Sequence, residues 1–187
     1  MKPGSAGAIL AGRRALAAVD PFFAWMEEIP LGVWLREADT FFAFPAALTV
    51  HVISLGLVVG SCAAIDLRVL GFLPGVPPGA MGRFLPMIWG AFVFVVASGL
   101  LLVLTYPIKN LTNPLFYFKL ACVAFGLWLM VRIDRRVLLA PAGGALVVAN
   151  AKILAVGSLV VWAAAITSGR FLAYTCTRLM VDFGRCP

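Results

Sequence analysis

Four long stretches of this sequence consist almost entirely of apolar residues. An α-helix rises about 1.5 Å per residue, so about 20 apolar residues span the ~30 Å hydrocarbon core of a membrane. A water-soluble fold of this length has no interior large enough to bury four such stretches. The sequence therefore predicts four transmembrane helices, at residues 41–65, 84–106, 114–133 and 145–172.

The composition separates this chain from soluble proteins and from membrane β-barrels. Hydrophobic residues make up 63% and charged residues 12% of the 187 positions, whereas soluble domains contain about 45–50% apolar and about 25% charged residues. Barrel strands alternate apolar and polar side chains over about 10 residues, and the four stretches do not alternate. We predict an all-α fold, a polytopic membrane protein with a four-transmembrane-helix bundle.

Two segments flank the predicted bundle, which occupies residues 41–174. The first segment, residues 1–40, ends in a stretch at 21–40 that mixes aromatic and acidic side chains, as helices lying in the membrane interface do. Pro30 should divide that stretch into two helices, because proline disrupts a helix interior. The second segment is the tail at residues 175–187. Four spans place both segments on the same side of the membrane.

The distribution of positive charge indicates lipid rather than nucleic acid as the partner. The net charge is +7, and it is spread over termini and loops without a basic run. The positive-inside rule assigns the side with more arginines in short loops to the cytoplasm. This predicts termini that face out, where Cys176 and Cys186 could pair in an oxidising space. The cytoplasmic arginines would be Arg68, Arg83, Arg132, Arg135 and Arg136.

His51 is the only histidine of the chain and lies within the first predicted span. It is ten residues past Phe41, or about 15 Å along the helix axis, which is near the middle of the bilayer. An imidazole at that depth needs a partner, because an unpaired polar group in lipid is costly. Two partners remain open: a hydrogen-bonding group on a neighbouring helix, or a metal such as haem iron.

Four further polar residues lie within the spans or at their ends. Lys119 lies five residues past Pro114, shallow enough for its side chain to extend to the headgroups. Asp66 and Arg68 are two residues apart, so they do not face each other on a helix, and each is expected to have a structural polar partner elsewhere. Arg170 follows Gly169 near the end of the fourth span.

A set of residues spread over the four spans carries a resemblance to a known family. The set consists of Trp34-Leu35-Arg36, Phe44-Pro45, His51, Gly56, Gly60, Asp66-Leu67-Arg68, Leu70-Gly71, Trp89, Phe92, Ser98-Gly99, Asn113-Pro114, Phe118-Lys119, Gly169-Arg170 and Ala173-Tyr174. In order and spacing it resembles a family of small bacterial four-helix membrane proteins of unknown function. The resemblance covers residues 33–175 and implies a multi-pass protein of the bacterial inner (plasma) membrane. Many members have another histidine near the end of the third helix, where this chain has Trp128, Met130 and Arg132, and this departure weakens a two-histidine site.

A looser likeness is to HemJ-type haem-binding protoporphyrinogen oxidases and to CopD-type membrane proteins. These proteins also have a histidine and a later glycine on the first helix and a lysine that opens the third. The likeness implies a haem b with His51 as axial ligand to the iron and with Lys119 or Arg170 near the propionates. A second axial ligand would come from Met, Lys, Tyr or a partner chain.

Three functions follow as alternatives from the sequence. The first is a haem b-binding redox or electron-transfer component of the membrane. The second is a non-catalytic accessory subunit, bound to other membrane protein subunits or to further copies of itself. The third is a small-solute transporter, which is disfavoured because the spans contain few polar residues to line a path. The sequence identifies neither a substrate nor an enzymatic reaction.

Overall fold

The computed structural model describes residues 21–175 apart from residues 24, 77–79, 81 and 134–144. In these residues the secondary structure is helical, and four helices are long and apolar enough to cross a membrane. The predicted all-α fold with four spans is confirmed. The spanning helices are α3 (Phe44–Leu70), α5 (Phe84–Thr105), α7 (Pro114–Ile133) and α8 (Ala145–Tyr174).

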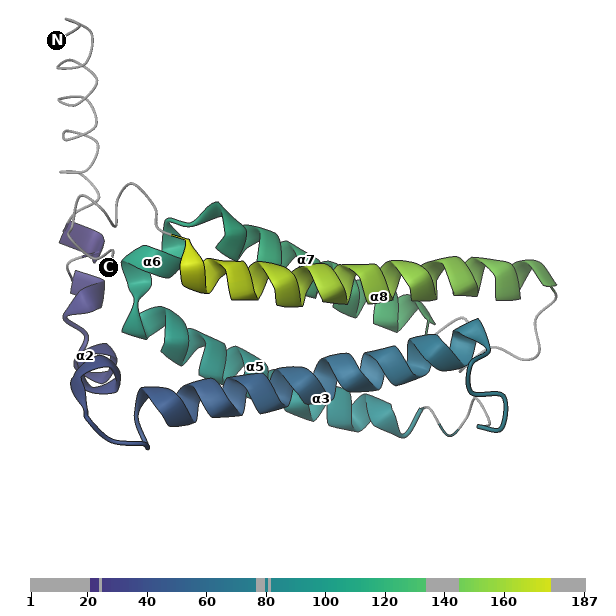
Figure 1. Cartoon of the computed structure of the whole chain (residues 1–187), viewed down its shortest axis with the longest axis horizontal. Coiled ribbons are helices and arrows are strands. Elements are labelled where there is room, and N and C mark those ends of the chain that lie inside the picture. The colour runs from purple at the N-terminus through teal and green to yellow at the C-terminus, as the bar shows by residue number, and fades with distance from the viewer. Residues whose placement is uncertain (1–20, 24, 77–79, 81, 134–144, 176–187) are drawn as a thin grey trace, which may run out of the picture.

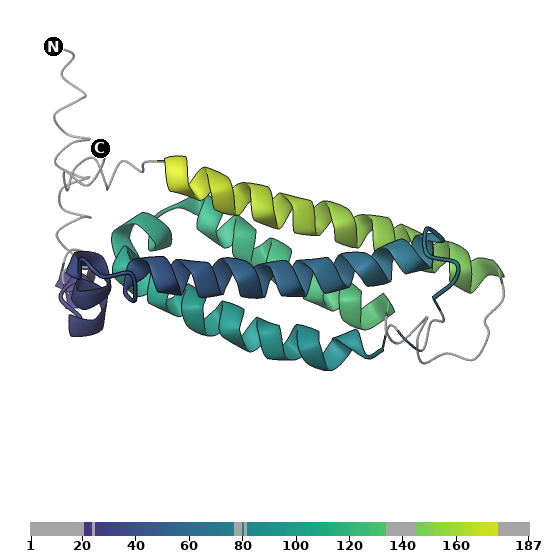
Figure 2. The same ribbon diagram turned by 60° about the horizontal axis from the view of Figure 1, so that its bottom comes forward.

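The four long helices form two antiparallel pairs. Helix α3 packs along α5, α7 packs along α8, and the contact between α3 and α8 joins the two pairs (Figures 1 and 2). Helix α3 begins and α8 ends at the same end of the bundle, as an even number of spans requires. Many large apolar side chains of the four long helices are exposed on the outside of the bundle, which suits a surface that faces lipid.

Local sequence signals determine where the helices begin and end. Gly71 ends α3 in the left-handed conformation (φ 99°), and its N–H bonds back to the carbonyls of Leu67 and Arg68, each at 3.1 Å. Glycine adopts this conformation without a steric cost. Asn113 begins α7, because its Oδ1 accepts a hydrogen bond from the N–H of Leu115 at 3.0 Å. The Nδ2 of Asn113 also donates to Thr175 Oγ1 at 2.7 Å, which ties the start of α7 to the end of α8.

Two short helices, α2 (Pro30–Glu37) and α6 (Pro107–Leu111), lie at one end of the bundle. Residues 25–27 are helical, and the chain turns before Pro30 starts α2, so the expected break at Pro30 is present. The sequence predicted only a second span that ends at residue 106, just before Pro107. In the structure Pro107 also starts α6, because its fixed φ suits the first position of a helix.

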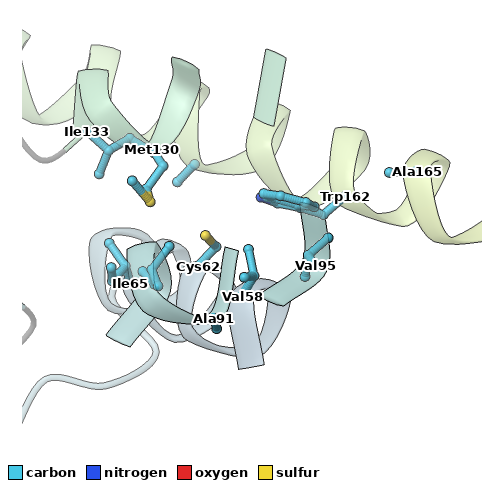
Figure 3. Close-up of a cluster of buried hydrophobic side chains, with 11 residues drawn as sticks. Val58, Cys62, Ile65, Ala91, Val95, Met130, Ile133, Trp162 and Ala165 are labelled. Atoms are coloured by element: carbon cyan, nitrogen blue, oxygen red, sulfur yellow. The ribbon is translucent and has the colours of Figure 1, made fainter. Parts of the chain in front are cut away.

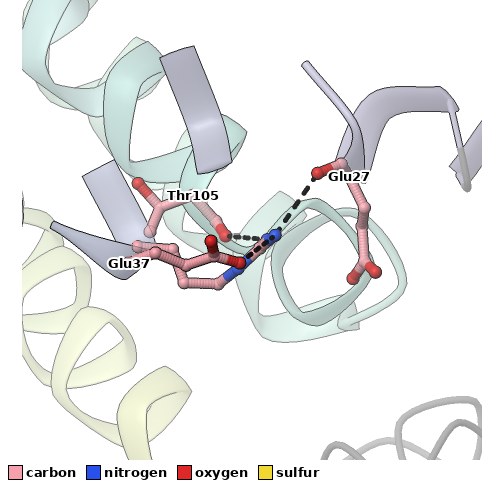
Figure 4. Close-up of polar contacts among 4 residues, drawn as sticks. Glu27, Glu37 and Thr105 are labelled. Atoms are coloured by element: carbon pink, nitrogen blue, oxygen red, sulfur yellow. Dashed lines mark hydrogen bonds and ion pairs between the residues drawn. The ribbon is translucent and has the colours of Figure 1, made fainter. Parts of the chain in front are cut away.

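Helix α2 is held against the end of α5. A Cβ on Gly32 would lie 2.6 Å from the carbonyl oxygen of Leu104, so the two backbones meet at this glycine. Arg36 donates to the carbonyl oxygen of Thr105 at 3.3 Å and to that of Glu27 at 3.4 Å (Figure 4). Its guanidinium also lies 3.9 Å from the carboxylate of Glu37. A cation at the C-terminus of α5 is favourable, because unpaired carbonyls make that end negative.

The apolar core lies where all four long helices meet (Figure 3). Trp162 is its largest fully buried side chain, with 2% of its surface exposed. Gly126 of α7 faces the indole, and a Cβ there would lie 2.9 Å from Trp162 Cε2. The other core residues are Val58, Cys62, Ile65, Ile88, Ala91, Val95, Met130, Ile133, Ala155 and Ala165.

Some of the sequence predictions concern residues outside the described part of the chain. These are the segment at 1–20, the tail beyond Thr175 with its pairing of Cys176 and Cys186, and the loop arginines Arg135 and Arg136. The interfacial position of residues 21–40 and the division into flanking segments and bundle stay predictions.

Candidate functional site

His51 lies in α3, seven residues past Phe44, and its side chain is 8% exposed. Its Nδ1 lies 3.0 Å from the Oγ of Ser98 on α5. The histidine is therefore buried between the two helices of the first pair and has a hydrogen-bond partner on the second of them. The sequence left open a hydrogen-bonding partner on a neighbouring helix or a metal. The structure shows the first of these at Nδ1, where Ser98 of α5 is the partner.

The surroundings of Ser98 determine which ring nitrogen of His51 carries the proton. The Ser98 hydroxyl has one hydrogen, and besides His51 its oxygen lies 2.5 Å from the carbonyl oxygen of Phe94 and 3.3 Å from that of Val95. A carbonyl only accepts, so the hydroxyl donates to one of these carbonyls and its oxygen accepts from His51. The neutral imidazole then carries its hydrogen on Nδ1, and Nε2 keeps a free lone pair.

Gly99 provides the room for the imidazole. A Cβ at this position would lie 3.3 Å from His51 Cε1 and 3.6 Å from Nδ1. Such a contact is tighter than ordinary van der Waals packing, which is about 3.5–4.0 Å between carbon atoms. The adjacent residues Ser98 and Gly99 thus supply the hydrogen-bond partner of the ring and the space that it occupies.

Lys119 approaches the same site from the second helix pair. Its side chain is partly buried in α7, and its charge acts on the His51 imidazole. The glycine at 169 on α8 faces the lysine: a Cβ there would lie 3.5 Å from Cε and 3.7 Å from Nζ of Lys119. Two separate contacts are thus defined: His51 lies against Ser98 and Gly99 between α3 and α5, and Lys119 lies against Gly169 between α7 and α8. The charge of Lys119 is near enough to act on the imidazole.

The other residues singled out in the sequence lie apart from His51. Arg170 is exposed on the outer surface of α8, although the preceding residue, Gly169, contacts Lys119. Arg68 is partly buried, and its Nε donates to the carbonyl oxygen of Val76 in the loop after α3. As expected from their spacing, Asp66 and Arg68 do not form an ion pair in the described structure.

The donor set at His51 fits one axial ligand of a haem. Histidines that bind metals usually donate the hydrogen of their other ring nitrogen to a fixed partner, and Ser98 is such a partner here. Lys119 offers a positive charge of the kind that balances a propionate. Met130, which stands near the position where many members of the resembled family have a histidine, lies in the apolar core beside Ile133. In the described residues no three His, Cys, Asp or Glu side chains gather into a metal-binding group.

A second polar cluster contains partners that the sequence did not reveal. Asp66 on α3 is 1% exposed, and Ser158 on α8 lies near its carboxyl, but no hydrogen bond of normal geometry joins Asp66 Oδ2 and Ser158 Oγ. Within the described structure, Asp66 Oδ2, Ser158 Oγ and Trp162 Nε1 are buried without a hydrogen-bond partner. One signal was visible, because Ser158 and Trp162 are four residues apart and so share a helix face.

A comparison of the chain with protein-family models, with curated proteins and with solved structures found no match.

Proposed function

We propose that this multi-pass membrane protein is a haem b-binding component of electron transfer, with His51 as an axial ligand of the haem iron. One observation carries the proposal: His51 Nδ1 lies 3.0 Å from Ser98 Oγ. With Ser98 as the acceptor of the Nδ1 hydrogen, Nε2 has a lone pair available for a metal. A buried histidine with one nitrogen fixed and the other free is the arrangement that haem proteins use for their axial ligand.

The residues around His51 have distinct roles in this proposal. Ser98 fixes the tautomer and the orientation of the ring, and Gly99 admits the ring between α3 and α5. Lys119 contributes positive charge that offsets a propionate in a medium of low dielectric constant. The haem itself would supply the one-electron chemistry. The protein excludes water from the imidazole, since His51 is 8% exposed.

Absorption spectra of the purified protein, oxidised and then reduced with dithionite, test the proposal. We expect a reduced α-band in the wild type and its loss in His51→Ala. Ser61→Ala is the matched control, because Ser61 is also a buried polar residue of α3 and lies ten residues, or about 15 Å, along the helix from His51; this variant should keep its haem. Wild-type protein that stays colourless after expression with a haem precursor and after addition of hemin would refute the proposal.

A second candidate is the non-catalytic accessory subunit. The observation that favours it is a group of exposed aromatic side chains on and beside α2, outside the membrane-spanning helices. They are Trp25, Trp34, Phe41 and Phe42. Large apolar side chains gathered at a surface mark contacts with proteins or with membranes. Affinity purification in mild detergent should then recover other polypeptides, and Trp34→Ala together with Phe42→Ala should release them.

A further inference from the structure

We propose that Asp66, Ser158 and Trp162 form a proton-binding site inside the bundle, in which the carboxyl of Asp66 carries the proton. The site is separate from His51 and does not depend on a haem. Asp66 and His51 are fifteen positions apart on α3, or about 22 Å along the helix axis. No role in catalysis is part of this proposal.

The first reason is the number of polar atoms that this region leaves without partners. In native structures a few per cent of buried polar groups have no partner, and each such group calls for an explanation. Here Asp66 Oδ2, Ser158 Oγ and Trp162 Nε1 share this condition. Ser158 and Trp162 lie on one face of α8, Ser158 faces Asp66, and the indole nitrogen lies at the ring edge directed toward Met130 and Cys62 (Figure 3).

The second reason is the absence of a compensating charge among the described residues around Asp66. An ionised carboxylate buried without a counter-charge is so costly that the group usually binds a proton instead. The neighbouring titratable group on α3 is the Cys62 thiol, which is 1% exposed and, as a neutral S–H, carries no charge that could compensate a carboxylate. The cations of the packed elements are directed elsewhere: Arg68 binds Val76, Arg132 lies 4.7 Å over the exposed Trp128 ring, and Arg83 and Lys152 are exposed.

The third reason is that the protonated carboxyl can take part in the cluster as a donor as well as an acceptor. As a carboxylate, Asp66 can only accept, whereas the protonated carboxyl can donate its O–H to Ser158 Oγ. The remaining carboxyl oxygen still accepts, Ser158 Oγ both accepts and donates, and the Trp162 N–H is a further donor of the cluster. One water molecule would complete this set where two groups do not meet directly, since a buried water typically bonds about three polar groups.

The position of Asp66 allows the proton to exchange with water. Asp66 is four residues before the end of α3, so it lies about 6 Å from that helix end. Binding is a simple proton transfer: a hydronium ion from the aqueous side gives its proton to the carboxylate oxygen and leaves as water. No electron and no further reactant takes part.

Infrared spectroscopy of the protein in lipid nanodiscs, with ¹³C-labelled aspartate carboxyls, tests this site directly. We expect one aspartate to be protonated at neutral pH and to ionise reversibly as the pH is raised, while circular dichroism shows that the helices persist. The labelled band should disappear in Asp66→Asn, a substitution of nearly the same shape. Asp39→Asn is the matched control, because Asp39 is exposed, and it should keep the band.

Ser158→Ala then examines the hydrogen bond to the proton. The carboxyl band should shift in frequency in this variant, because its O–H loses the proposed acceptor. Two results would overturn the proposal. One is a spectrum of the wild type in which every aspartate is ionised at neutral pH. The other is a protonated band at Asp66 that persists until the protein unfolds, which would describe a fixed structural group rather than a site that binds and releases a proton.

Discussion

Substitution of Gly126 by alanine should destabilise the bundle through a single contact. The added Cβ would lie 2.9 Å from Cε2, 3.1 Å from Cζ2 and 3.3 Å from Nε1 of Trp162. Carbon atoms pack comfortably at about 3.5–4.0 Å, so the ring or helix α7 has to move by roughly 0.6–1 Å. Trp162 is almost fully buried, and its rigid ring cannot swing aside as a flexible side chain would. Overpacking of this kind costs about 1–3 kcal/mol.

A matched substitution isolates this cost from the effect of alanine on the helix itself. Alanine stabilises a helix by about 0.5–1 kcal/mol relative to glycine wherever space is available. Gly56 on α3 has that space, because nothing lies within 4 Å of the position of its Cβ. Gly56→Ala should therefore be neutral or stabilising. The difference between the two variants should equal the overpacking cost of about 1–3 kcal/mol.

Thermal or denaturant unfolding in detergent micelles, followed by circular dichroism, provides the measurement. A second substitution supplies an internal test of the mechanism, because Trp162→Phe shortens the ring that Gly126 faces. The double variant Gly126→Ala/Trp162→Phe should lose less stability than the sum of the two single variants. Equal stability of Gly126→Ala and Gly56→Ala would refute the packing of α7 against Trp162 as described.

Three further outcomes follow from individual contacts. Ser98→Ala removes the acceptor of His51 Nδ1, and we expect a loss of about 0.6–2 kcal/mol in micellar unfolding experiments, the range measured for hydrogen bonds between membrane helices. Gly71→Ala should cost about 1–2 kcal/mol because an L-residue resists the left-handed conformation, whereas Gly75→Ala, with open space and no such constraint, should be neutral. Arg36→Gln should weaken the attachment of α2 to α5, and limited proteolysis should then cleave near α2 faster than in the wild type. Unchanged cleavage would contradict the role of this guanidinium.

The sequence was sufficient to predict the spans, because a run of about 20 apolar residues has one common solution in a membrane. The start of α7 was equally predictable, since Asn113 and Pro114 form a local signal that needs no tertiary contact. Helix α6 was not predicted, because a proline that ends one helix can also start the next. The sequence identified His51 and Lys119 as candidates because polar residues are rare in such runs.

The partners of those candidates depend on how the helices pack, and the sequence does not determine that packing. A helix that is apolar on all sides has no distinct buried face, so its rotation cannot be read from its pattern. Ser98 is therefore not distinguished in the sequence from other small residues of the spans, and only the packing of α5 against α3 makes it the partner of His51. Asp66 and Ser158 are far apart in the chain, and no local sequence pattern indicates that α3 and α8 pack side by side.

The arrangement of the helices in two antiparallel pairs has a consequence for biosynthesis. Helices α3 and α5 emerge first from the ribosome and can pair at once, because their contacts are local in the chain. Asp66 is then in the membrane before its neighbour Ser158, because Ser158 lies on α8, the last spanning helix to be synthesised. An acidic side chain exposed to lipid is unfavourable. A chain truncated before α8 would therefore expose Asp66 to lipid, and membrane proteases or chaperones could recognise this exposed acidic side chain.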